Sequence, residues 1–221
     1  MSDILNVQNL TKIFGQRIVI DNLSFHVPAE ASLAITGPSG CGKSTLLNII
    51  GMLEAPTHGS IMLEDKPLPA INSTAATKLR RKQINYLFQS YALISDLTAH
   101  DNAMLGLHYA PISKEEKTAR INEILAKLGL YHVKDERVST LSGGEQQRLA
   151  LARCILKPGN LILADEPTGA LDRKLSGRVL EQMLELQHEH HKTLIIVTHD
   201  PHVAKECNYV MQLNGSEDER E

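Results

Sequence analysis

Short apolar runs alternate with amphipathic stretches along this chain, and that alternation predicts an α/β fold. Residues 4–10 and 18–27 have strand-like patterns and are expected to form an antiparallel β element near the N-terminus. Three later runs, residues 32–36, 161–164 and 194–198, are too apolar to have a side that faces water. We therefore expect them to be central strands of a mostly parallel sheet that is buried on both faces.

The segment between residues 89 and 157 is rich in helical patterns and is expected to form a helical subdomain inserted in the sheet domain. One face of a helix in this segment carries apolar residues at the helical spacing, namely Ile121, Ile124, Leu125 and Leu128. Another helix is expected over residues 173–188. Residues 1–214 are therefore expected to form a single domain, and the polar, mostly acidic residues 215–221 a disordered tail.

Composition narrows the class of protein. The chain has 221 residues, 42% of them hydrophobic, and a formal net charge of −3, so no overall positive field would recruit nucleic acid. It contains no apolar stretch of about 18 residues and no signal-peptide pattern, and it is expected to be cytoplasmic unless another protein holds it at a membrane. Its cysteines are far apart and lack zinc-ligand spacing.

A glycine-rich segment follows the first buried run. It consists of Gly37, Pro38, Ser39, Gly40, Cys41, Gly42, Lys43, Ser44 and Thr45, and it fits the phosphate-loop pattern G-x-x-x-x-G-K-[ST]. Residues 46–52 are predicted to form a helix directly after this loop. Phosphate groups would then bind the backbone N–H groups of the loop and the positive end of the helix. Lys43 is expected to reach the β- and γ-phosphates, and the Ser44 hydroxyl to bind Mg²⁺.

Titratable side chains follow the other two buried runs, at the point where each predicted strand ends. Asp165 and Glu166 follow the second run, and His199 follows the third. Ligands of open α/β sheets bind at the carboxyl ends of the strands. We therefore expect Asp165 to hold the Mg²⁺ shell, Glu166 to polarise a water for attack on the γ-phosphate, and His199 to meet the same edge.

A second anion-binding feature lies at the start of a predicted helix. Ser142 and Glu145 form a capping-box pattern around Gly143 and Gly144, which leaves a hydroxyl and free N–H groups at the helix N-terminus. One nucleotide does not require two such sites. A head-to-tail dimer would use both, because the second site of each chain would close over the ATP of the other.

Together these motifs resemble the nucleotide-binding subunits of ATP-binding-cassette (ABC) transporters over residues 1–214. The resemblance implies that Phe14 stacks on adenine and that Gln89 senses the γ-phosphate, approaches Mg²⁺ and leads to the contact with a membrane subunit. Ser142, Gly143 and Gly144 become the signature that contacts ATP in trans. Asp172 becomes the loop aspartate that links the two active sites, and His199 becomes the switch histidine.

The resemblance also implies the cofactors, partners and location. It implies ATP and Mg²⁺, a second copy of the chain, a separate membrane permease and a position at the inner face of the cell membrane. Residues 141–148 and 163–172 look like the branch that exports macrolides, lipoproteins or bacteriocins, although Glu145 stands where many relatives have glutamine. The segment 91–107 is implied to receive the membrane subunit.

Two alternatives remain at this point. One is a soluble cassette ATPase that acts on nucleic acid or ribosomes, but such proteins typically have doubled cassettes, a long coiled coil or zinc modules, and this sequence has none of these patterns. The other is a cassette whose membrane partner transports nothing and transmits force to cell-wall enzymes.

Overall fold

The computed structural model describes residues 2–169 and 173–214, so Asp172 and the predicted tail lie outside the described residues. The helices are α1 (Lys43–Ile50), α2 (Thr74–Lys82), α3 (Ala99–Gly106), α4 (Lys114–Lys127), α5 (Gly143–Leu156), α6 (Arg173–Glu189) and α7 (Pro201–Glu206). The strands are β1 (Asp3–Phe14), β2 (Arg17–Pro28), β3 (Ser32–Thr36), β4 (His58–Leu63), β5 (Lys66–Pro67), β6 (Ile84–Leu87), β7 (Leu161–Asp165), β8 (Thr193–Val197) and β9 (Tyr209–Gln212).

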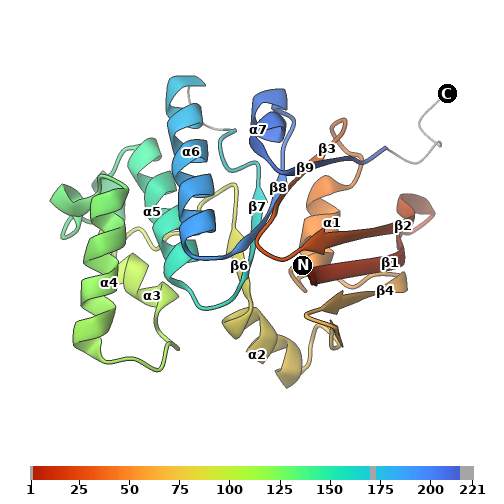
Figure 1. Ribbon diagram of the computed structural model, residues 1–221, viewed down its shortest axis with the longest axis horizontal. Helices are drawn as coiled ribbons and strands as arrows, with labels where there is room; N and C mark the ends of the chain where they lie inside the picture. Colours follow the sequence, from red (N-terminus) through yellow and green to blue (C-terminus); the bar gives the residue numbers. More distant parts are fainter. Residues whose placement is uncertain (1, 170–172, 215–221) are drawn as a thin grey trace.

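A parallel sheet with the strand order β6-β7-β8-β3-β9 forms the centre of the molecule (Figure 1). The three predicted central strands are its inner strands β7, β8 and β3, and the predicted fold class is confirmed. Every residue of β8 is buried, because helices and a second sheet cover both faces. Since all these strands run the same way, their carboxyl ends lie along one edge of the sheet. The predicted catalytic and phosphate-binding residues come at or directly after the ends of β6, β7, β8 and β3, and so lie at that edge.

The N-terminal strands form a separate antiparallel sheet in the order β2-β1-β4-β5. β1 pairs with both β2 and β4, and its register with β2 shifts between Val7 and Leu10. Asn9 lies within that shift with a φ of 48°, which is the left-handed conformation that asparagine tolerates better than most residues. The predicted antiparallel element is therefore present, with β4 and β5 as strands that the sequence patterns did not predict.

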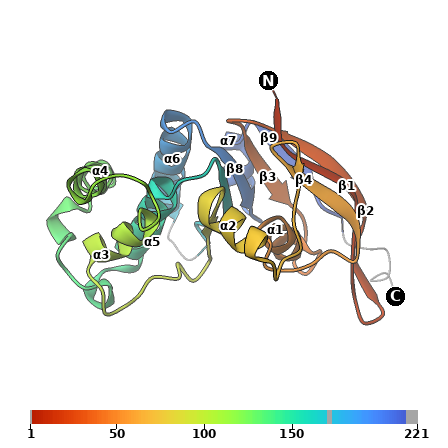
Figure 2. The same cartoon turned by 90° about the horizontal axis from the view of Figure 1, so that it is seen from below.

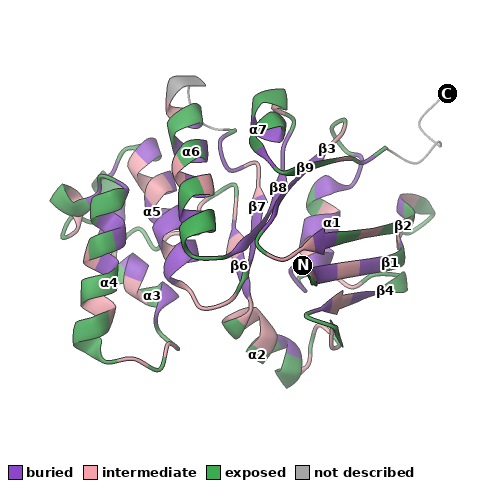
Figure 3. Ribbon diagram, in the orientation of Figure 1, coloured by how far each residue is buried: buried purple, intermediate pink, exposed green. Residues whose placement is uncertain are grey.

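Two apolar cores lie on opposite faces of the parallel sheet. Leu33, Ile35 and Leu163 belong to the core beneath α1 and the antiparallel sheet. Their neighbours Ala34 and Ile162 belong to the core shared with α3 to α7. This alternation follows from the two-residue period of a strand. Figures 2 and 3 show the resulting layers, with α1 on one side of the sheet and α5 and α6 on the other.

The helices α3, α4 and α5 gather at one end of the molecule, beside α6 (Figure 1). Ile121, Ile124 and Leu125 of α4 are buried there, as their spacing predicts, and Leu128 follows them into the same core. Among the helices of the described residues, none is both long and apolar enough to cross a membrane.

Candidate functional site

The phosphate loop joins β3 to α1 at the carboxyl edge of the parallel sheet. The Lys43 ammonium lies inside the curve of the loop and donates hydrogen bonds to the carbonyls of Gly37 (2.9 Å) and Pro38 (2.7 Å). Gly42 caps α1 with a φ of 97°, and a Cβ at this position would lie 2.8 Å from Val19. The loop therefore requires glycine here, both for its backbone conformation and for its close approach to β2.

The β1–β2 hairpin flanks this loop. Val19 packs against Gly42, and the Arg17 guanidinium approaches Gly40. Phe14, at the end of β1, is 47% exposed although it is aromatic, and the Lys12 ammonium lies 4.5 Å from its ring centroid. An exposed ring beside a phosphate loop has the chemistry that a stacking contact with a base requires.

The first hydroxyl of α1 meets the end of β7. Ser44 Oγ donates a 3.0 Å hydrogen bond to Asp165 Oδ1. Burial raises the pKa of Asp165, while the hydrogen bond from Ser44 lowers it, the nearby Glu166 raises it and Lys43 lowers it. Two oxygen atoms at hydrogen-bonding distance beside a phosphate loop are the ligand types that Mg²⁺ prefers, so these residues fit that ion.

Glu166 and His199 meet across neighbouring strand ends. Glu166 Oε1 lies 2.9 Å from His199 Nδ1. The backbone of Glu166 has a φ of 47°, and its N–H donates to the carbonyl of Val197 at the end of β8. This sharp turn directly after Asp165 points the two adjacent carboxylates at different partners, Ser44 and His199.

Gln89 stands two residues beyond β6, at the same edge, and is exposed. The loop continues through Tyr91 and Ala92, whose carbonyls accept hydrogen bonds from the Arg153 guanidinium of α5. The sequence patterns did not identify Arg153. Its only signal is an arginine in the otherwise apolar stretch at residues 149–156.

The predicted second anion site is the N-terminus of α5. Ser142 and Glu145 form the predicted capping box, which is confirmed. Glu145 Oε2 accepts hydrogen bonds from the Ser142 N–H (2.8 Å) and from its Oγ (2.6 Å), and these bonds lower the pKa of Glu145. A Cβ at Gly143 would meet nothing within 4 Å, whereas one at Gly144 would lie 2.6 Å from Leu175 of α6.

The structure brings most of the predicted residues together and leaves one group apart. Those at the carboxyl edge of the sheet are Gln89, Asp165, Glu166, His199 and residues 37–45. Ser142, Gly143 and Gly144 begin a helix on the opposite face of the sheet from α1 (Figure 2). Within one chain the two anion sites are therefore separate.

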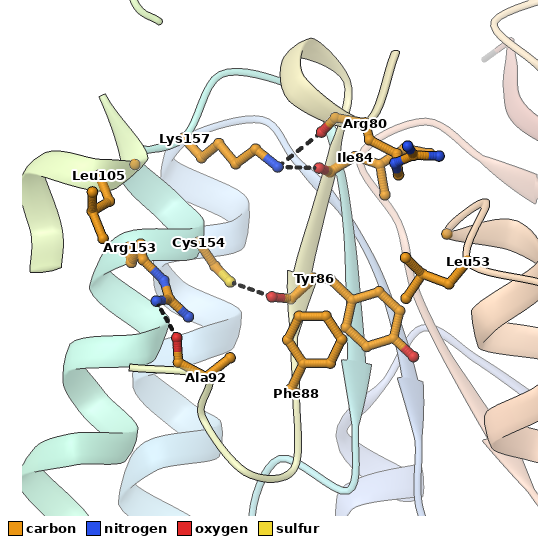
Figure 4. A pocket seen from close by; sticks show the side chains of 12 residues that line it. Leu53, Arg80, Ile84, Tyr86, Phe88, Ala92, Leu105, Arg153, Cys154 and Lys157 are labelled. Carbon is orange, nitrogen blue, oxygen red and sulfur yellow. Dashed lines mark hydrogen bonds between the residues drawn. The ribbon is translucent and has the colours of Figure 1, made fainter. Parts of the chain in front are cut away.

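A groove of about 390 Å³ opens between β6 and the helices α3 and α5 (Figure 4). Leu53, Phe88 and Leu105 give it apolar walls, and both leucines are among the exposed large hydrophobic residues. Arg153 and Lys157 line it from α5.

Known proteins match this chain closely in sequence and in structure. The family model of the ABC transporter matches residues 20–169. The macrolide export ATP-binding/permease protein MacB of Mannheimia succiniciproducens is 40% identical over 219 residues, which is 97% of this chain and 34% of MacB. The chain belongs to the ABC transporter family. It carries that family's ATPase cassette, and it spans about a third of the length of the curated relatives it matches.

Solved structures of ABC cassettes share the fold. The dimeric structure of the bacterial ABC transporter cassette MJ0796 superposes with a TM-score of 0.86 at 35% identity, and the match covers 95% of this chain and 94% of that one. The post-hydrolysis dimer of the same cassette with ADP and Pi gives a TM-score of 0.85 at 34% identity over 95% and 94% of the two chains. The resemblance inferred from the motifs is thereby confirmed, including the macrolide-export relatives.

Proposed function

We propose that this chain is the ATP-hydrolysing subunit of an ABC transporter, that it works as an ATP-dependent head-to-tail pair, and that it drives a separate membrane permease. The observation that carries the proposal is the pair of contacts at the ends of β7 and β8. Ser44 with Asp165 forms an oxygen site for a cation, and Glu166 with His199 forms a carboxylate–imidazole pair one residue away.

The phosphates of ATP would bind the backbone N–H groups of residues 37–45, with the Lys43 ammonium as their countercharge. Phe14 would stack on the adenine. Mg²⁺ would be held by Ser44, Asp165 and Gln89, and when bound it neutralises charge on the β- and γ-phosphates.

Glu166 would hold and polarise the attacking water. The His199 ring, whose Nδ1 lies 2.9 Å from Glu166 Oε1, would orient that carboxylate, and with both ring nitrogens protonated it would also donate from Nε2 to a γ-phosphate oxygen. Gln89, at the neighbouring strand end, would enter when the γ-phosphate is present. Little covalent chemistry is required, because phosphoryl transfer depends mainly on positioning and charge stabilisation.

The separation of the two anion sites within one chain supports the head-to-tail pair. Ser142, Gly143 and Gly144 begin α5, which packs on the opposite face of the sheet from α1 and its phosphate loop. A second copy would bring its phosphate loop to them, and Asp172, which lies outside the described residues, would link the two sites.

The permease is proposed from the relatives and from the groove. MacB is named an ATP-binding/permease protein, and this chain corresponds to about a third of it. The groove has the exposed leucines Leu53 and Leu105 on its walls, which suits a short segment of the permease. The cassette would then sit peripherally at the inner membrane face, and a peptide, lipoprotein or drug would pass through the permease.

The segment 91–107, which the resemblance implies as the contact with the membrane subunit, contributes part of the groove lining. Among residues 91–107, Leu93 packs against the helical core, whereas Leu105 lines the groove with Leu53, which precedes that segment. The alternative functions, on nucleic acid or ribosomes or as a non-transporting force transmitter, have no specific observation in their favour.

Replacing Glu166 by glutamine tests the proposal, because it keeps the shape of the side chain and removes the base. Loss of a positioned general base lowers the rate by about 10²–10⁴. In size-exclusion chromatography, wild type should run mainly as a monomer and Glu166→Gln with ATP as a dimer. Adding Ser142→Arg should restore the monomer, since it obstructs the trans site. A double variant that binds ATP and still dimerises would contradict the head-to-tail pair.

A further inference from the structure

The guanidinium of Arg153 holds the backbone directly beyond Gln89. Its Nη1 donates a 2.6 Å hydrogen bond to the Ala92 carbonyl, and its Nη2 donates a 2.7 Å bond to the Tyr91 carbonyl. Figure 4 shows the side chain reaching from α5 to Ala92 of this loop. Only Ser90 stands between Gln89 and the clamped segment, so the position of Gln89 depends on where the arginine places Tyr91 and Ala92.

The clamped residues have a conformation that needs outside support. Tyr91 has a φ of 62° and Ala92 a φ of 48°. Both lie in the left-handed region, which is unfavourable for residues with a Cβ and persists only where contacts enforce it. Inside the turn, the Tyr91 N–H donates to Phe88 and the Ala92 N–H to Ser90. The carbonyls, however, are held from outside by Arg153.

A second contact fixes the far end of the loop to the same group of helices. The fully buried Asn102 of α3 accepts a hydrogen bond from the Ile94 N–H and donates to the Ile94 carbonyl. The loop after Gln89 is therefore attached to α5 and α3, while the chain before Gln89 is attached to the parallel sheet through β6. Gln89 lies at the boundary between these two parts.

The helix that carries Arg153 also begins with the signature residues. α5 runs from Gly143 to Leu156, with Ser142 as its N-cap. Arg153 lies eleven positions after Ser142, which is about 16 Å along a helix that rises about 1.5 Å per residue. A movement of α5 that shifts Ser142 therefore also shifts the carbonyls of Tyr91 and Ala92.

We propose that Arg153 is a positioning residue for ATP hydrolysis, which joins the Gln89 loop to the signature helix. Closure of Ser142–Gly144 over the partner's ATP and entry of Gln89 into its own chain's site then become one movement. The inference rests on the catalytic role proposed for Gln89. The Arg153 guanidinium also lines the groove, so a permease segment bound in the groove would contact the side chain that holds the Gln89 loop.

Arginine suits this role better than lysine. Its planar fork presents two N–H groups to two neighbouring carbonyls at once, whereas an ammonium is a point charge on a flexible stem. Among the described residues, no carboxylate forms an ion pair with Arg153, so the backbone carbonyls are its observed partners.

Steady-state ATPase kinetics of the full chain test the proposal, with Lys157→Ala as the matched control. Lys157 lies one helical turn after Arg153, lines the same groove and donates to two carbonyls, of Arg80 and Ile84, but does not touch the loop. Arg153→Ala should lower kcat by about 10- to 100-fold, as expected for a reacting group misplaced by about 1 Å. Its KM for ATP should stay unchanged, since the phosphate loop is intact. Lys157→Ala should keep the wild-type kcat even if its melting temperature falls equally.

A double-mutant cycle shows whether Arg153 acts through Gln89. If it does, Arg153→Ala combined with Gln89→Ala should be no slower than Gln89→Ala alone. In the Glu166→Gln background, Arg153→Ala should still form the ATP-dependent dimer, because the signature itself is unchanged. Arg153→Lys should recover part of the kcat by keeping one of the two bonds.

Four results would overturn the inference: a wild-type kcat in folded Arg153→Ala, an equal kcat loss in Lys157→Ala, multiplied losses in the double variant, or loss of the ATP-dependent dimer. If Arg153→Ala does not fold, the kcat and melting temperature of Arg153→Lys and Arg153→Gln decide the question in the same way. If Gln89→Ala itself keeps the wild-type kcat, the proposed role of Gln89 fails first. A slow Gln89→Ala with an unaffected Arg153→Ala rejects the inference alone.

Discussion

Glu166 Oε1 lies 2.9 Å from Nδ1 of His199, so a carboxylate at the end of β7 is paired with an imidazole at the end of β8. The Glu166 side chain is mostly buried, whereas that of His199 is largely exposed at the sheet edge. The imidazole can therefore contact a bound nucleotide while its other nitrogen keeps the carboxylate in place.

Replacing His199 by alanine should lower kcat by about 10²-fold or more, the usual cost of removing a donor aimed at a developing charge. ATP affinity should change little, because the phosphate loop is untouched. His191→Ala is the matched control, since His191 precedes the same strand and lies 3.0 Å from Glu30. Steady-state ATPase assays and a nucleotide titration check both variants. Equal rate losses at the two histidines would contradict the assignment.

Gly143→Ala should weaken the ATP-dependent dimer without destabilising the folded chain. A Cβ at Gly143 meets nothing within 4 Å in the single chain, so the free energy of unfolding should stay level or rise by up to about 1 kcal/mol. At a site pressed against the partner's ATP, the extra methyl should cost about 1–3 kcal/mol. The ATP-dependent dimer formed in the Glu166→Gln background should then dissociate at least about fivefold more readily.

The control for this glycine lies on α6. Gly177 also has open space at its Cβ position, so Gly177→Ala should leave both folding and the dimer intact. Thermal melts and sedimentation of the two variants, with and without ATP, make the comparison. A Gly143→Ala variant that dimerises as tightly as Gly177→Ala would place the signature away from the partner.

Lys192 should make stability depend on pH. Burial lowers its pKa from 10.5 to about 8, and its ammonium donates hydrogen bonds to the carbonyls of Lys157 (3.0 Å) and Gly159 (2.6 Å). Between pH 8 and 10.5 the unfolded chain binds this proton more tightly than the folded chain does, so the contribution of Lys192 to stability rises with pH. At about 1.4 kcal/mol per pKa unit, the gain is at most about 3 kcal/mol.

Urea unfolding of wild type and Lys192→Met at pH 7.5 and 10 measures this gain as a difference. The difference is needed because burial also raises the pKa of Cys154 to about 11, and that thiol makes stability fall with pH over an overlapping range. The stability of wild type relative to Lys192→Met should increase with pH. If the difference between wild type and Lys192→Met stays flat with pH, the prediction is rejected.

The parts of the site that local sequence encodes were predictable. Three features depend only on residue types at fixed short spacings, which a sequence shows directly. They are the phosphate loop, the apolar run before Asp165 and the capping box at Ser142. Strand β6 was missed because it has only four residues and contains the buried polar residue Asn85, which breaks an apolar run. The Arg153 clamp was also missed, since it joins residues 61 and 62 positions apart through backbone carbonyls, and no periodic pattern records such a contact.

The hydrogen bonds by which the side chains of α5 and its C-cap hold β6 and its loop are accepted by main-chain carbonyls. Cys154 donates to the carbonyl of Tyr86, Lys157 to that of Ile84, and Arg153 to the loop beyond. Every residue type supplies a carbonyl, so substitutions along β6 and its loop can reshape the groove without removing a single acceptor. In the proposed complex, exchanges of side chains along β6 and its loop would therefore change the surface offered to the membrane partner, while the hydrogen bonds that join α5 to β6 are kept.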